Sequence, residues 1–124
     1  MLTFEELQAV NRARCEESYH PIQDWSPTDW ACAMGGECGE ALNLVKKLRR
    51  LTGPTDRVTL ELVQQITHGD LLESIGLELA DVVIYADLLA TRIGLSLGEC
   101  VAKKFNATSQ KINSGKRITG PGDI

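Results

Sequence analysis

The sequence has few aromatic side chains and no long uninterrupted hydrophobic run. Aromatic residues make up 5% of its 124 positions, so aliphatic packing must supply most of the core. No apolar stretch approaches the roughly 20 residues that cross a bilayer. The N-terminus also has no basic segment followed by an apolar one, as a secretory signal would. We therefore expect a protein of the cytoplasm with no membrane partner.

Excess basic charge and metal-binding cysteine pairs are also missing. The net charge is −4, which disfavours nucleic acid as a partner held on a general basic surface. The four cysteines form no C-x-x-C pair and are accompanied by only two histidines, so a zinc site is not expected. We interpret the cysteines as reduced, small residues of the core.

Helical periodicity and helix-capping patterns dominate what the sequence does contain. They predict four main helices, over about 3–18, 26–50, 70–93 and 96–112. A further short helix could form over residues 57–67. No strand-like alternation is seen, so the fold class is all-α and resembles a four-helix bundle. We expect one domain over residues 1–113 and a flexible, glycine-rich tail over 114–124.

The segment GGECGEALNLVKK, residues 35–47, combines two features that weaken a helix. Its three glycines each cost about 1 kcal/mol relative to alanine in a helix interior. Glu37 and Glu40 lie three residues apart, where like charges face the same side and repel. Close approach of a neighbouring helix or of a ligand to this backbone would explain the glycines.

Acidic residues also interrupt the apolar faces of both long helices. Glu37 lies in the middle of one stripe and Glu40 is beside it, while Glu78 and Asp81 repeat the arrangement on the next long helix. The apolar members of the two stripes are Trp30, Met34, Ala41, Leu44 and Leu48, and Leu71, Ile75, Val82, Tyr85 and Leu89. The sequence thus predicts an E-x-x-E pair and an E-x-x-D pair that face the interior.

Four inward carboxylates must be protonated, neutralised by basic residues, or bound to cations. No lysine or arginine is interleaved near them on these stripes, and oxygen ligands at this spacing suit Mg²⁺ or Mn²⁺. The alternative is that some of the acids face solvent. A di-iron bundle would need Glu-x-x-His pairs, and neither His20 nor His68 supplies one.

Three segments, GGECGEALNLVKK, LELADVVIY and KKFNATSQK, together resemble the all-α nucleoside triphosphate pyrophosphatase superfamily, specifically MazG-like proteins. The resemblance covers roughly residues 26–112. It implies a hydrolase that converts a (d)NTP and water to the (d)NMP and pyrophosphate with Mg²⁺, as in the removal of surplus or abnormal nucleotides. It also implies that the metal ligands and catalytic acids are Glu37, Glu40, Glu78 and Asp81.

The resemblance further implies that Lys104 and Asn106 contact the nucleotide. Lys111 shares a helix face with Lys104 and is a further phosphate candidate. Trp25 and Trp30 could stack on a base, although core packing explains Trp30 equally well. In the tail, Lys116 and Arg117 could cover the phosphates, but the composition favours a free tail.

The third predicted helix is apolar nearly all round, and one copy of the chain cannot bury all of this apolar surface alone. We therefore expect a homodimer or a dimer of dimers with the base pocket near a subunit interface. Two alternatives stay open. One is a non-catalytic helical module whose acids bind a basic partner. The other is a dedicated dUTPase or phosphoribosyl-ATP pyrophosphatase of the same superfamily.

Overall fold

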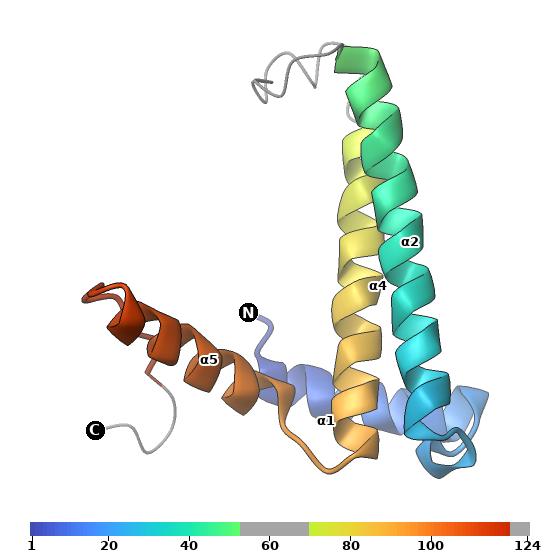
Figure 1. The fold of residues 1–124 in the computed structure, drawn as a ribbon. Coiled ribbons are helices and arrows are strands. Elements are labelled where there is room, and N and C mark those ends of the chain that lie inside the picture. The colour runs from blue at the N-terminus through green and yellow to red at the C-terminus, as the bar shows by residue number, and fades with distance from the viewer. Residues whose placement is uncertain (53–69, 120–124) are drawn as a thin grey trace. The chain divides into compact units, whose positions relative to one another are not determined.

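The structure, a computed structural model, describes residues 1–52 and 70–119. Its elements in chain order are α1 (Phe4–Arg14), η1 (Cys15–Tyr19), η2 (Ile22–Asp24), α2 (Pro27–Thr52), α4 (Asp70–Arg92) and α5 (Leu97–Lys111) (Figure 1). No strand occurs among the described residues, in agreement with the all-α prediction. None of the helices in these ranges combines the length and hydropathy of a membrane span. The helix predicted over 57–67 lies outside the described residues.

The capping patterns place the helix ends correctly. Thr3 Oγ1 accepts a hydrogen bond of 3.0 Å from the Glu6 amide at the start of α1. Ser96 Oγ accepts one of 3.4 Å from the Glu99 amide at the start of α5. Gly94 follows α4 with a φ of 81°, a conformation that suits glycine after a helix.

The α-helix predicted to run to about residue 18 ends at Arg14, and the next five residues form the π-helix η1. This wide turn buries Cys15, whose Sγ lies 3.3 Å from the His20 carbonyl oxygen. The prediction of core cysteines is therefore right for Cys15. It is wrong for Cys32 and Cys100, which are exposed.

The chain divides into two compact units, Met1–Pro27 with Asp87–Ile124 and Thr28–Ala86. In the first unit, α1 packs on α5 at Gly98. A β-carbon at Gly98 would lie 2.6 Å from the Phe4 β-carbon, so this contact requires glycine. The single domain predicted over residues 1–113 stays a prediction.

In the second unit, α2 and α4 lie side by side and antiparallel (Figure 1). The ring of Trp30 near the start of α2 lies 6.3 Å from the ring of Tyr85 toward the end of α4, whereas Glu37, further along α2, approaches Glu78. Trp30 and Ala41 are buried, while Leu42 on the other side is exposed. The helical phase predicted for the α2 stripe is therefore correct.

Candidate functional site

Three of the four predicted acids come together between α2 and α4. One carboxylate oxygen from each of Glu37, Glu78 and Asp81 lies within 4.8 Å of the other two, and we call these residues the acid cluster. Glu78 and Asp81 share a face of α4 because they are three residues apart, and Glu37 meets them from the apolar stripe of α2. All three side chains are half-buried.

The fourth predicted ligand, Glu40, is exposed and lies outside this group of three. It is one turn along α2 from Glu37, and its carboxylate interacts with both Glu37 and Glu78. Glu40 therefore belongs to the rim of the acid cluster, where solvent can reach it.

Burial and like charge both act on the acid cluster. Burial raises the pKa of Glu37 above its ordinary value, and the charges of Glu40, Asp81 and Glu78 raise it further. Burial also raises the pKa of Glu78, followed by its hydrogen bond and charge interaction with Glu40 and the charge of Asp81. A hydrogen bond with Glu37 opposes that change. The arrangement therefore disfavours simultaneous ionisation of all the acids in the absence of a cation.

Two oxygens of the acid cluster have no hydrogen-bond partner among the described residues. Glu37 Oε2 and Glu78 Oε2 are both buried, and no described donor reaches them. Buried polar atoms in folded proteins are nearly always satisfied, so exceptions call for an explanation. A bound cation would explain both, since it supplies the opposite charge and accepts carboxylate oxygens as ligands.

The donor set fits a hard divalent cation. All the ligand atoms are carboxylate oxygens, the type that Mg²⁺ and Mn²⁺ prefer. The cluster's limit of 4.8 Å is close to the about 4.2 Å that separates opposite oxygens around one Mg²⁺. Small side-chain rotations would bring the three oxygens to one ion, with solvent or substrate oxygens completing its coordination.

The predicted nucleotide contacts lie on α5, in the first unit, whereas the acid cluster is in the second. Lys104 and Asn106 are two residues apart, which is a rotation of about 200° around an α-helix. The two side chains therefore leave opposite sides of α5. Lys111 leaves the same side as Lys104 and is exposed.

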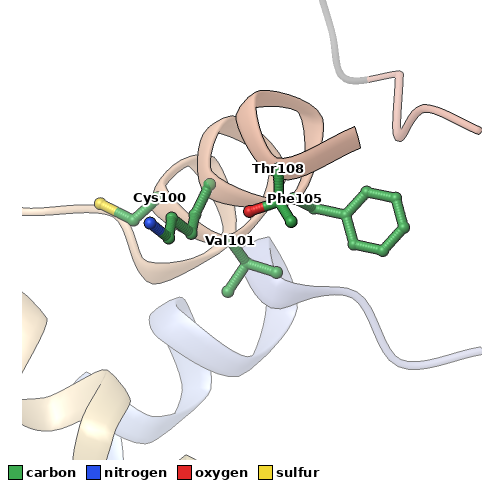
Figure 2. A pocket seen from close by; sticks show the side chains of 5 residues that line it. Cys100, Val101, Phe105 and Thr108 are labelled. Atoms are coloured by element: carbon green, nitrogen blue, oxygen red, sulfur yellow. The ribbon is translucent and has the colours of Figure 1, made fainter. Parts of the chain in front are cut away.

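Lys104 helps to line a shallow, mainly apolar pocket on α5. The other lining residues are Cys100, Val101, Phe105 and Thr108, which Figure 2 shows on the outside of the helix. Their spacing defines one continuous helix face. Asn106 is not part of this face.

Asn106 is instead engaged by the chain itself. Its Nδ2 donates to the Ile118 carbonyl oxygen and its Oδ1 accepts from the Ile118 amide, both at 2.8 Å. Ile118 belongs to the segment that the composition predicts to be flexible. Residues 120–124 of that predicted tail lie outside the described residues.

The two tryptophans differ in their surroundings. Trp30 is 2% exposed and packs near Tyr85, which is the position of a core residue and leaves no open ring face for a base. Trp25 is half-buried, with its ring centroid 4.7 Å from that of His20. Arg92 Nε donates a 2.8 Å hydrogen bond to the Trp25 carbonyl oxygen.

Within the described part of this chain, no helix packs closely against the glycines of residues 35–47. A β-carbon built on Gly35, Gly36 or Gly39 would meet no described atom within 4 Å. The alternative of a neighbouring helix is therefore wrong for the described part of this chain. Close approach of a ligand stays a prediction.

The sequence reasoning missed a buried polar pair in the first unit. Asn11 Nδ2 donates to Asp87 Oδ2 at 2.9 Å, and the two residues are 4% and 1% exposed. Burial raises the pKa of Asp87, while the hydrogen bond from Asn11 lowers it. The available signal was an aspartate surrounded by apolar residues in the segment YADLLA, residues 85–90.

The geometry and the residue types are the basis for assigning a function. Comparisons of the chain with protein-family models, with curated proteins and with solved structures found no match.

Proposed function

We propose that this chain is a Mg²⁺-dependent nucleoside triphosphate pyrophosphohydrolase of MazG-like type, converting a (d)NTP and water to the (d)NMP and pyrophosphate. The observation that carries the proposal is the acid cluster with its two unpartnered buried oxygens. Buried carboxylate oxygens that no described donor reaches, from two adjacent helices, are what a divalent cation needs and what a stable core avoids. Mn²⁺ would substitute for Mg²⁺ because it accepts the same ligands.

Each acid has a role that follows from its position. Glu37, Glu78 and Asp81 would hold the cation, which would neutralise charge on the triphosphate and on the leaving pyrophosphate. Glu40 is exposed beside them, so we assign it to orient the attacking water and accept its proton. Lys104 and Lys111, on one side of α5, are proposed to bind phosphate oxygens.

Exposed apolar side chains on α2 and α4 support a homodimer or a dimer of dimers. Leu42 and Leu77 are each 63% exposed, and Leu79 is 54% exposed. A second copy would remove these leucines from water, which stabilises association by about 25 cal/mol per Å² of apolar surface. Light scattering should show a dimer or tetramer at micromolar concentration. A purely monomeric protein would contradict this part of the proposal.

The same exposed leucines are compatible with a non-catalytic module that binds a partner helix. Such a module has no reason to depend on divalent cations. Thermal melts with and without Mg²⁺ and a non-hydrolysable nucleotide separate the two functions, because a ligand of the native state raises its melting temperature. An unchanged melting temperature would favour the module.

Pyrophosphate release is the direct test. Wild-type protein with Mg²⁺ should release pyrophosphate from at least one member of a panel of ribo- and deoxyribonucleotides, including dUTP and phosphoribosyl-ATP. Glu78→Gln should lower the rate by roughly 100-fold or more, because it removes a charged ligand for the cation. Glu73→Gln is the matched control, since Glu73 is an exposed acid on the same helix, outside the cluster.

Removal of the metal should abolish the activity, and added Mn²⁺ should restore it. If no nucleotide yields pyrophosphate, or if Glu78→Gln is as active as Glu73→Gln, the proposed function is wrong. The panel also decides between a broad-range enzyme and the two dedicated alternatives.

A further inference from the structure

The chain reverses direction directly after α5. Asn113 has a φ of 58°, a left-handed conformation that asparagine tolerates better than most residues. The Ser114 amide then donates a 2.8 Å hydrogen bond to the Ser109 carbonyl oxygen. The following residues therefore return along α5 instead of continuing its direction.

The Asn106 side chain holds the returning segment against α5 through hydrogen bonds. The Asn106 amide forms two hydrogen bonds of 2.8 Å with the main chain of Ile118, which is 12 residues further on. We call this pair of bonds the Asn106 clamp. A second link inside the loop is the Lys116 amide, which donates to Ser114 Oγ at 3.1 Å.

Two cations lie immediately before the clamped residue. Lys116 and Arg117 are both exposed. Residues 97–119 contain five basic residues and one acidic residue, although the whole chain has a net charge of −4. The clamp therefore gives a fixed main-chain position to two cations in a part of the described chain that carries a net positive charge.

We infer that Asn106 is a positioning residue, which holds Lys116 and Arg117 through the clamp as an anion-binding arm for a polyphosphate chain. The choice of ligand rests on the proposed function. The role differs from the direct contact with nucleotide that the family resemblance implies for Asn106. A ligand that used the same edge of the amide would have to break both 2.8 Å hydrogen bonds.

The clamp strengthens binding by ordering the arm in advance. Lysine and arginine bind phosphate oxygens through charged hydrogen bonds. On a free segment containing Gly115, the backbone entropy lost when each residue is ordered at the moment of binding would oppose the interaction. The clamp and the turn at Asn113 remove part of that loss before the ligand arrives.

Ile118→Pro tests the clamp without removing a charge. Proline has no amide hydrogen, so it cannot donate to Asn106 Oδ1, whereas Ile118→Ala keeps the amide and is the matched control. Binding of inorganic tripolyphosphate with Mg²⁺ would be measured by calorimetry on the full chain. We expect Ile118→Pro to bind roughly tenfold more weakly, the size of effect given by loss of one hydrogen bond of ordinary strength. Ile118→Ala should stay within about twofold of wild type.

Further variants test whether the two cations bind the anion and whether Asn106 acts through the clamp. Lys116→Ala combined with Arg117→Ala should weaken binding by roughly tenfold or more, because the anion loses both charged partners. Asn106→Ala removes both bonds and should weaken binding at least as much as Ile118→Pro, and the Asn106→Ala, Ile118→Pro double variant should be no weaker than Asn106→Ala alone, because the proline then has no clamp left to break. Hydrogen exchange should show faster exchange of the Gly115–Ile118 amides in Asn106→Ala, with α5 unchanged.

Several results would overturn the inference. Wild type that binds no tripolyphosphate, or Ile118→Pro that binds as well as wild type, would exclude a role for the clamp. Tighter binding by Ile118→Pro would show that the segment competes with the ligand for Asn106. If tripolyphosphate binding depends on the clamp but no nucleotide yields pyrophosphate, only the proposed function is wrong. If pyrophosphate is released but tripolyphosphate binding does not depend on the clamp, only the role inferred for Asn106 is wrong.

Discussion

Both units of this protein contain carboxylate oxygens that are buried from solvent, but the two sites are built in opposite ways. Asp87 in the first unit is 1% exposed and receives a 2.9 Å hydrogen bond from Asn11, a neutral partner. Glu37 and Glu78 in the second unit are only half-buried, yet each has a buried oxygen without a partner among the described residues, and their neighbours are other acids.

The difference separates a carboxylate that is paired within the fold from carboxylates that we propose to hold a cation. A buried acid that only stabilises a fold needs a donor, and Asp87 has one. The acid cluster gathers like charges and holds two buried oxygens that no described group satisfies, an arrangement that costs stability unless a cation or a proton compensates for it. Such local conflicts are typical of functional sites, where ligand binding compensates for them.

The largest expected effect on stability comes from removing the donor of the Asn11–Asp87 pair. Asn11→Ala leaves a buried carboxylate without a hydrogen-bond partner, so the free energy of unfolding should fall by about 2–3 kcal/mol. Urea denaturation at neutral pH measures this change. Asn43→Ala, at an exposed position of α2, is the control and should change stability by less than about 0.5 kcal/mol. Equal effects of the two variants would mean that the pair contributes no stability.

The next effect concerns pH. Because burial raises the pKa of Asp87 above its ordinary value of 3.8, the folded state binds its proton more tightly than the unfolded state does. Between 3.8 and the raised folded value, the contribution of Asp87 to stability should fall as pH rises. The slope is at most about 1.4 kcal/mol per pH unit, and the contribution is constant above that window.

Asp87→Asn isolates this contribution, because asparagine keeps an oxygen acceptor for Asn11 and does not titrate. Subtracting the unfolding free energies of the variant from those of wild type across the acid range should leave the predicted slope. A difference that is flat or has the opposite sign would show that Asp87 is not the group responsible.

The smallest effect is expected at the acid cluster without metal. Glu37→Gln removes one of the repelling charges and supplies an amide that can donate to the neighbouring carboxylates. The metal-free protein should therefore gain about 1 kcal/mol of stability while its stabilisation by Mg²⁺ disappears. Thermal melts in chelator and in Mg²⁺ test both parts, with Glu73→Gln as the control. If metal-free Glu37→Gln is less stable than metal-free wild type, Glu37 stabilises the fold, as Asp87 does.

Much of the local structure could be predicted from the sequence. The caps at Thr3 and Ser96 and the glycine after α4 define helix ends within a few residues, because capping depends on neighbours in the chain. The apolar period of α2 also predicts which side carries Glu37. The π-helix η1 was not predicted, since its five residues continue a helical pattern without any local mark of a wider turn.

The candidate site was only partly predictable. Periodicity placed Glu37, Glu78 and Asp81 on inward faces, and the structure brings them together. It did not separate Glu40, because a residue at the edge of a stripe is buried or exposed according to the helix that packs beside it. Helix geometry alone places Asn106 and Lys104 on opposite sides of α5. It does not predict that the Asn106 side chain forms hydrogen bonds with the main chain of Ile118.

By itself, the sequence determined where the helices of this protein run and which acids lie on their apolar sides. Both properties depend on the order of residues within one or two turns, and hydrophobic periodicity records them directly. Only the tertiary structure decided which groups meet: three acids between α2 and α4, Asn11 with Asp87, and Asn106 with the returning chain. These contacts join residues far apart in the chain, and their geometry depends on how whole helices pack and where the backbone turns.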